Sequence, residues 1–334
     1  MFEETIDRSA SPFAPTPEPW SGSVGEVSLT PFRKNSSTLC IRRPVPTRKH
    51  MWRGTSFADR LGELAVTCHG SRTLQDTLAK AAEEGDKRTL FEMAEKLCAD
   101  PQLLIYLVED KFANYFVQSL CEWVDDGLAV RILTIMLSAV ASFGDLCVHQ
   151  YGSHVVQGFI GRGQTQKFIS IKLVEALSKE IPRIGTDFLG SICLVQAVKG
   201  LLTSCRLVAA IAPHTIELSL SRHGHLVVME TIAKASSQTL GLIEKTLADN
   251  LSLLLESEYG FRVVAHALDL EKNGKVNMKY SRVRLFAERL EFDQTHFKLI
   301  NHIMTNFPTH PVVENDLIPR IIEIVKAGCV EQRE

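Results

Sequence analysis

One short pattern recurs along the chain at intervals of 34 to 43 residues and limits the folds that it can adopt. The pattern is a doublet in which an aromatic, histidine or leucine residue precedes a glycine or an alanine. Apolar residues near each doublet follow the i, i+3, i+4, i+7 spacing of an amphipathic helix. A repeat of this length holds a helix pair that is too small to bury its own apolar face, so neighbouring repeats must stack. An α-solenoid is therefore expected, with the small residues at positions 70, 113, 152, 190, 224 and 260.

The helical pattern extends from Ser56 to the end of the chain. A seventh repeat follows the sixth after another 36 residues, and His296 occupies its small-residue position. The last segment, residues 307–330, is expected to form a terminal capping helix or a degenerate eighth repeat. Residues 53–334 are accordingly interpreted as one repeat domain.

Residues 1–52 have the composition of a flexible arm. Prolines stand at positions 12, 15, 17 and 19, serine and threonine are frequent, and no apolar period is present. Such a segment cannot form a helix or offset its loss of conformational entropy by apolar burial. The arm is expected to be disordered. Its basic cluster, from Arg42 to Arg53, is interpreted as a solvated linker, a nuclear address or an RNA-contacting tail.

The composition excludes several classes of protein. Hydrophobic residues make up 45% of the 334 residues, which suffices for a core, and no run reaches the roughly 18 apolar residues of a membrane helix. The first residues lack the apolar segment of a secretory signal. Eight cysteines are scattered without a CxxC pair, which indicates free thiols rather than a disulfide framework. We expect a monomer in a reducing compartment, the cytoplasm, with the nucleus or nucleolus as alternatives.

The sequence motifs do not point to an enzyme. No GxGxxG, P-loop or HExxH motif occurs. His223 and His225 are two residues apart, and on a helix such side chains point in different directions and cannot share a metal ion. No catalytic activity, cofactor or metal is expected. The net charge of −2 gives no general support to nucleic-acid binding, so any such function must rest on a local face.

A polar triplet follows the first three doublets at constant spacing. In the stretch GSHVVQGFI, the apolar residues of the expected helix form one stripe toward the core. Ser153 and Gln157 are four residues apart, which places their Cβ atoms about 5–6 Å apart on the opposite face. Two polar side chains at that separation can form hydrogen bonds with the edge of one planar base, and the ring of His154 can stack between successive bases. This arrangement indicates a surface shaped for nucleobases.

The stretches HGSRTLQ, FANYFVQ and YGSHVVQ resemble the second helices of Pumilio (PUF) repeats. Repeat length, doublet and triplet are similar to this family over about residues 56–334. The resemblance implies a right-handed α-solenoid of about seven to eight helical repeats in a curved array, which binds single-stranded RNA with one base per repeat. In this family the first and fifth triplet residues contact the base edge, and the second residue stacks on the base.

The first three triplets resemble readers of adenine, uracil and adenine. Because family members bind RNA antiparallel, the resemblance implies that repeats one to three read 5′-AUA-3′ or a close variant. Carried over residue by residue, the base-edge contacts are Ser71, Gln75, Asn114, Gln118, Ser153 and Gln157, and the stacking contacts are Arg72, Tyr115 and His154.

Repeats four to seven depart from the family pattern, because none of their triplets resembles an edge reader. Weaker RNA contacts are assigned there to His225, Arg262 and Lys298. Two functions follow as expectations. The first is an RNA-binding adaptor in post-transcriptional regulation, with mRNA 3′ untranslated regions or precursor rRNA as targets and protein effectors on the outer face. The second is a degenerate solenoid that acts as a protein scaffold in a ribonucleoprotein assembly and recognises few bases itself.

Overall fold

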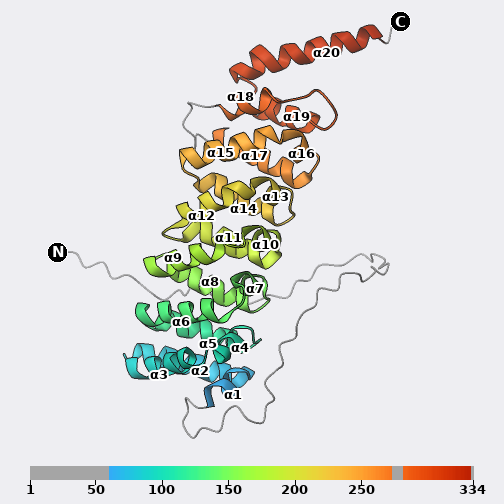
Figure 1. The fold of residues 1–334 in the computed structure, drawn as a ribbon. Helices are drawn as coiled ribbons and strands as arrows, with labels where there is room; N and C mark the ends of the chain where they lie inside the picture. Colours follow the sequence, from blue (N-terminus) through green and yellow to red (C-terminus); the bar gives the residue numbers. More distant parts are fainter. Residues whose placement is uncertain (1–59, 273–280, 332–334) are drawn as a thin grey trace, which may run out of the picture. The chain divides into compact units, whose positions relative to one another are not determined.

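The computed structural model describes residues 60–272 and 281–331, which lie within the expected repeat domain. The proposed arm of residues 1–52 lies outside the described residues. Within the described ranges every regular element is a helix (Figure 1), and no helix there is long and apolar enough to cross a membrane.

Six repeats each contain a short helix, a central helix and a third helix, and a seventh central helix follows them. The short helices are α1 (Leu61–Ala65), α4 (Pro101–Val108), α7 (Phe143–Val148), α10 (Ile181–Thr186), α13 (Thr215–Ser219) and α16 (Leu251–Leu255). The central helices are α2 (Cys68–Glu83), α5 (Ala113–Trp123), α8 (Gly152–Gly163), α11 (Phe188–Gly200), α14 (Gly224–Lys234), α17 (Glu258–Lys272) and α19 (Phe297–Asn306). The third helices are α3 (Lys87–Ala99), α6 (Asp126–Ala139), α9 (Lys167–Leu177), α12 (Ser204–Ile211), α15 (Ser237–Asp249) and α18 (Arg282–Ala287).

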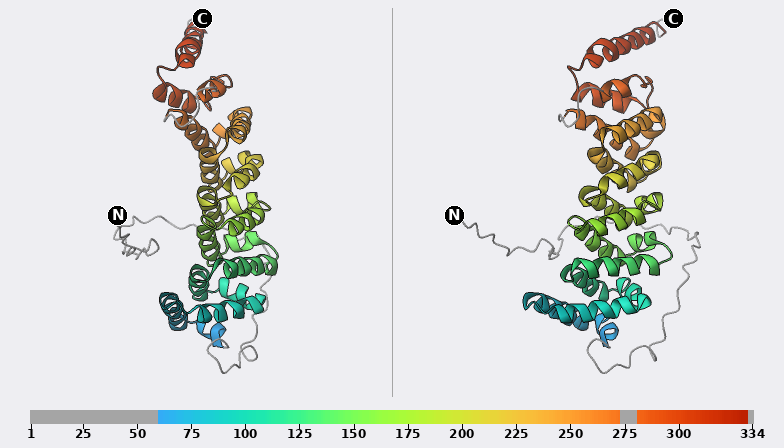
Figure 2. Two further views of the ribbon diagram at one scale, coloured as in Figure 1. Left: turned by 90° about the vertical axis from the view of Figure 1, so that its left-hand side faces the viewer. Right: turned by 60° about the vertical axis from the view of Figure 1, so that its left-hand side comes forward.

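Each central helix packs against the next one, from α2 through to α19. The side view in Figure 2 shows the helices of successive repeats stacked in two columns. A π-helical turn (Val313–Leu317) and a final helix, α20 (Ile318–Glu331), follow the seventh central helix. The α-solenoid of about seven to eight repeats expected from the sequence is thus confirmed.

A polar residue three positions before each small residue starts the central helix. Its side chain accepts a hydrogen bond from the backbone N–H of the small residue or of the residue before it, which satisfies donors left without an intrahelical partner. Asp110 of the second repeat does so with both of these N–H groups, at 2.8 and 2.9 Å. The residues in this position are Thr67, Asp110, His149, Asp187, Ser221, Ser257 and Asp293.

The small residue lets the central helix approach the preceding short helix. A Cβ atom at Gly70 would lie 2.2 Å from the carbonyl oxygen of Leu64, and one at Gly190 would lie equally close to that of Ile184. A contact this short is repulsive, which explains why the position holds glycine in most repeats. The described segment between α18 and α19 contains no short helix, and only there does the larger His296 take this place.

The core follows the apolar stripe that the sequence predicts. On α8, Val155, Val156, Phe159 and Ile160 are all buried, and the corresponding stripes of neighbouring helices join one continuous apolar core. Two neighbouring thiols, Cys147 and Cys193, are part of this core. Burial of the apolar stripes between successive repeats is the main stabilising contribution to such an array.

The C-terminal repeats also bury a charged pair. Arg282 of α18 is 1% exposed, and its guanidinium forms an ion pair with Glu244 of α15 and donates to the carbonyl oxygen of Ala267 at 2.6 Å. The backbone N–H of Arg282 donates to the carboxylate of Glu271 at 2.7 Å. Burial raises the pKa of the Glu244 carboxyl, although the neighbouring guanidinium opposes the shift. This pair connects helices α15, α17 and α18.

Candidate nucleic-acid interface

The second residues of the first three triplets are exposed on adjacent central helices. Arg72 lies on α2, Tyr115 on α5 and His154 on α8, and these helices pack side by side. Tyr115 is 55% exposed, although its chain neighbours Asn114 and Phe116 are buried. Three planar side chains therefore face solvent in consecutive repeats, as the stacking interpretation requires.

The first residues of these triplets are buried, although they lie on the face opposite the apolar stripe of their own helix. Ser71, Asn114 and Ser153 are at most 2% exposed. The physical reason is the neighbouring repeat: the Ser71 hydroxyl donates to the carbonyl oxygen of Phe112 at 2.7 Å, next to the start of α5. The spacing of residues in the sequence predicts where a side chain lies on its own helix. It does not predict which side chains the neighbouring helix covers. Their contact with a base edge stays a prediction.

The fifth-position glutamines of repeats one and two are half-buried and held in place by these first residues. Gln75 donates from Nε2 to the hydroxyl of Ser71 at 3.1 Å. Gln118 donates in the same way to Oδ1 of Asn114, at 3.0 Å. In both amides the carbonyl oxygen accepts no hydrogen bond from the residues that the structure describes. The i, i+4 pairing that the sequence predicts is therefore present, with the glutamine as its accessible member.

The third repeat differs, because its glutamine is connected to the fourth repeat. Gln157 accepts at Oε1 a hydrogen bond of 3.2 Å from Nε2 of Gln196 on α11. The hydroxyl of Ser153 is buried without a hydrogen-bond partner among the described residues. Gln196 stands one place after the fifth position of its repeat and was therefore left out of the predicted site. Its half-buried amide continues the row of glutamines into the fourth repeat.

In the fifth repeat the triplet positions serve packing. His225 is 5% exposed, its Nδ1 lies 3.3 Å from the carbonyl oxygen of Ser221, and its ring centroid lies 5.2 Å from that of Tyr259. Burial lowers the pKa of His225 below its usual value. Leu226, which occupies the stacking position, is exposed. His225 was predicted as a weaker RNA contact, but its ring is covered by the neighbouring repeat.

The sixth and seventh repeats keep exposed cations at the second position. Arg262 forms an ion pair of 2.5 Å with Glu258 and lies 6.0 Å from the centroid of the Tyr259 ring. Lys298 is exposed beside Phe297, which is 66% exposed. Neither repeat carries a glutamine at the fifth position, where alanine and asparagine stand instead. Their role as phosphate or base contacts stays a prediction.

This repeated geometry agrees with comparisons to known proteins. Residues 60–93 and 142–168, which begin repeats one and three, match the model of the Pumilio-family RNA binding repeat. The resemblance of this chain to Pumilio repeats is therefore confirmed.

Two Pumilio relatives from Arabidopsis thaliana illustrate the divergence. Putative pumilio homolog 8, chloroplastic, is 21% identical over 218 residues, which cover 64% of this chain and 42% of that protein. Pumilio homolog 9 is 27% identical over 216 residues, which cover 60% of this chain and 34% of that protein. The chain thus spans less than half the length of these relatives.

Solved Pumilio structures match the fold. The Puf4 RNA binding domain bound to the HO endonuclease RNA 3′ UTR recognition sequence gives a TM-score of 0.65 at 18% identity, covering 82% of this chain and 81% of that domain. The RNA-binding domain of yeast Puf5p bound to AAT2 RNA gives 0.62 at 17% identity, covering 82% and 78%. The Pumilio-repeat fold therefore extends well beyond the two segments that match in sequence.

Proposed function

We propose that this Pumilio-repeat protein binds single-stranded RNA along its central helices and that repeats one to three each read one base. The observation that carries the proposal is the pairing, in adjacent repeats, of an exposed planar side chain with an anchored glutamine amide. Tyr115 and Gln118 on α5 are the clearest example. The solved structures with the same fold include domains bound to RNA, which supports the proposal.

The planar side chains would stack on the faces of successive bases. Stacking of a base on an aromatic ring contributes roughly 1–3 kcal/mol and works for any base, because every base has a π-face. Tyr115 and His154 offer rings for this contact, and the guanidinium plane of Arg72 can stack in the same way. Stacking therefore raises the affinity for RNA but does not select one base over another.

The glutamine amides would supply the choice of base. Each carbonyl oxygen can accept from a base N–H, while each amide nitrogen already donates to the side chain and to the backbone carbonyl oxygen of Ser71 or Asn114. The Watson–Crick edges of adenine and uracil each include a donor, which matches this acceptor. In this proposal Ser71 and Asn114 orient Gln75 and Gln118, and the preferred sequence remains 5′-AUA-3′.

The proposed cellular role is post-transcriptional regulation of mRNA or RNA processing. Three stacked bases with their edge contacts give only a modest affinity, so phosphate contacts from Arg72 and neighbouring repeats would have to add to it. Protein effectors would then bind the outer face formed by the third helices. We further propose that the protein acts as a monomer in the cytoplasm and that its targets are mRNA 3′ untranslated regions or precursor rRNA.

The proposal is tested by a double-mutant cycle between Tyr115 and the middle base. Binding of a labelled ten-nucleotide RNA containing AUA is followed by fluorescence anisotropy at near-physiological salt. Replacing the uracil with an abasic site, or Tyr115 with Ala, should each weaken binding about tenfold, and the two changes together should weaken it little more. Tyr115→Phe and Leu226→Ala serve as controls that keep the affinity. Additive effects would show that Tyr115 and the middle base do not meet.

A protein scaffold is the second candidate function. It is favoured by the later repeats, where Leu226, Phe297 and Phe188 expose large apolar side chains that offer nothing to a base edge. Exposed apolar groups of this kind are typical of protein-binding surfaces. If neither the AUA RNA nor a scrambled control binds, the scaffold becomes the preferred function.

A further inference from the structure

The segment between α18 and α19 brings together three metal-ligating side chains that the RNA proposal does not use. Glu291, Asp293 and His296 each offer a ligand atom, and these atoms lie within 4.8 Å of one another. Asp293 and His296 occupy the helix-starting position and the small-residue position of the seventh repeat. This repeat therefore departs from the others at the place where the cluster forms.

The imidazole of His296 is buried and only half satisfied. His296 is fully buried, and its Nε2 lies 3.3 Å from the hydroxyl of Ser252 on α16. Its Nδ1 lies 3.1 Å from Oδ1 of Asp293 but lacks hydrogen-bond geometry toward any described group. In the tautomer whose Nε2–H donates to Ser252, the Nδ1 lone pair faces the carboxylate oxygen. Two acceptors at this distance repel each other unless a proton or a metal cation lies between them.

Asp293 is held in the orientation that a ligand needs. Its Oδ1 accepts the backbone N–H of His296 at 2.8 Å, which fixes the carboxylate at the start of α19. Two ligand atoms about 2.1 Å from one tetrahedral ion are about 3.4 Å apart. Nδ1 and Oδ1 are 3.1 Å apart, so a small movement of the exposed carboxylate brings them to this separation.

Neighbouring arginines do not neutralise the two carboxylates. Arg289 pairs with Asp249 at 3.0 Å, and Arg320 donates to the carbonyl oxygen of Leu290 at 3.1 Å. Within residues 60–272 and 281–331, no lysine or arginine forms an ion pair with Glu291 or Asp293. Two carboxylates and an imidazole lone pair thus converge without a compensating cation from the described protein.

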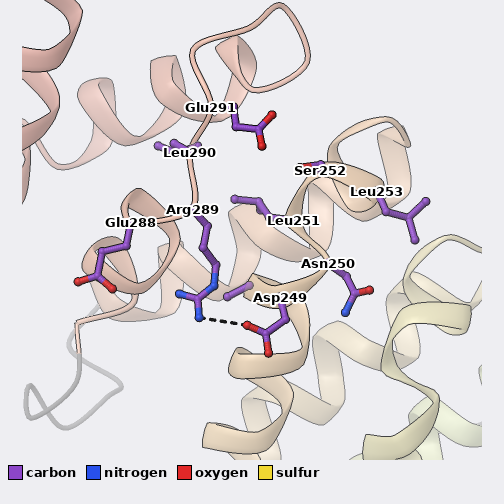
Figure 3. Close-up of a pocket in the computed structure, with 10 residues that line it drawn as sticks. Asp249, Asn250, Leu251, Ser252, Leu253, Glu288, Arg289, Leu290 and Glu291 are labelled. Carbon is purple, nitrogen blue, oxygen red and sulfur yellow. Dashed lines mark hydrogen bonds and ion pairs between the residues drawn. The ribbon is translucent and has the colours of Figure 1, made fainter.

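A cleft of about 620 Å³ borders this cluster at Glu291. It lies between the segment that joins α15 to α16 and the segment that follows α18, and Glu291 and Ser252 are among its lining residues (Figure 3). Among the lining residues drawn in Figure 3, the ion pair between Arg289 and Asp249 lies at the end away from Glu291. An ion entering from solvent would meet Glu291 on the wall of this cleft.

We propose that Glu291, Asp293 and His296 bind a divalent transition-metal ion such as Zn²⁺, with water completing the coordination. One imidazole and two carboxylates form a donor set that suits this class of ion. Ser252 acts as the outer partner that fixes the imidazole tautomer and connects the site to α16. The ion would fasten the seventh repeat to the sixth. The sequence pattern itself predicts no metal, because these ligands stand on a loop without a recognisable spacing.

The site is tested with Zn²⁺ on the full chain, reduced and stripped of metal with a chelator. Isothermal titration is expected to show one tight equivalent, and Zn²⁺ should raise the melting temperature. His296→Ala should remove that equivalent, and alanine fits because Ala113 holds the same position in the second repeat. Asp293→Asn, which keeps an oxygen for the N–H of His296, should weaken binding at least tenfold. Glu288→Gln, which changes a cleft residue outside the cluster, should leave binding unchanged.

Cysteine thiols are the competing zinc ligands, since Cys68 and Cys205 are exposed. Co²⁺ separates the two cases, because ligation by nitrogen and oxygen gives no thiolate charge-transfer band. Equal binding by the wild type, His296→Ala and Asp293→Asn would overturn the proposal, and so would the absence of tight binding to the wild type. A melting-temperature rise that survives His296→Ala would also contradict it.

Discussion

In the second repeat, Asn114 and Gln118 form a hydrogen-bonded amide pair beside the exposed ring of Tyr115. The fifth repeat differs at the same positions. There the ring of His225 packs on Tyr259, and Leu226 faces the solvent. Both repeats start their central helix with the same kind of polar cap and small residue. The residues that build the frame of a repeat, its polar cap and small residue, are therefore different from the residues that decide what its exposed positions can bind. Repeats one to three keep a polar row that fits bases, whereas repeats five to seven have no glutamine in this row.

The C-terminal repeats also contain charged groups inside the protein, away from this polar row. Arg282 and Glu244 form a buried pair there, and the seventh repeat gathers Glu291, Asp293 and His296 in one loop. Within the described residues of repeats one to three, no lysine, arginine or carboxylate is buried. Charge buried between repeats thus distinguishes the two ends of the solenoid, and the following predictions test where the two ends differ and what they share.

The largest expected effect is the loss of the buried arginine. Arg282→Ala leaves the carboxylate of Glu244 buried without its partner, which should lower the free energy of unfolding by about 3–5 kcal/mol. The measurement is chemical denaturation followed by circular dichroism. Arg88→Ala, which removes an exposed ion pair with Glu92 in the first repeat, should lower the free energy of unfolding far less, because solvent screens this pair. Equal losses in both variants would remove the distinction between the two ends.

The second prediction concerns the shared frame. Gly70→Ala and Gly260→Ala each place a Cβ atom 2.2 to 2.3 Å from a backbone carbonyl oxygen, and both should destabilise the protein by about 1–3 kcal/mol. Gly161→Ala on α8 meets nothing within 4 Å and should be neutral or stabilising by up to about 1 kcal/mol. Thermal denaturation of the three variants measures this. A cost at one end only would show that the repeats do not share one frame.

The smallest effect is a pH dependence that comes from the fifth repeat. Burial lowers the pKa of His225 in the folded protein below its unfolded value of about 6.5. The unfolded chain therefore binds the proton more readily, and stability should fall as the pH drops below about 6.5. His225→Gln should reduce this fall, while His266, whose pKa burial also lowers, keeps part of it. Melting temperatures between pH 5 and 8 give the slope, and an unchanged slope in the variant would contradict the prediction.

The sequence was sufficient to predict the features that one helix determines alone. The repeat period, the apolar stripe of Val155 and Phe159, and the exposure of Tyr115 depend only on helical geometry and on the spacing of apolar residues. The polar caps three residues before each small residue could also have been found, because their spacing is constant from Thr67 to Asp293.

Features that depend on a neighbouring repeat could not be predicted in this way. The burial of Ser71 results from the carbonyl group of Phe112, which is 41 residues away in the chain. The contact between Gln157 and Gln196 was missed because Gln196 stands one place outside the repeat frame. The cluster around His296 depends on the missing short helix before α19. In each case the position of the next helix, rather than the local pattern, decides what the side chain does.

The most direct test of the division between the two ends is photo-cross-linking of RNA. The AUA RNA, with 4-thiouridine as its middle base, is irradiated in complex with the full chain, and the cross-linked peptides are identified by mass spectrometry. We predict cross-links on α5 around Tyr115 and on the adjoining α8, with none on α14 or α17. Cross-links that fall mainly on α14, α17 or α19 would contradict the claim that the first three repeats read the bases.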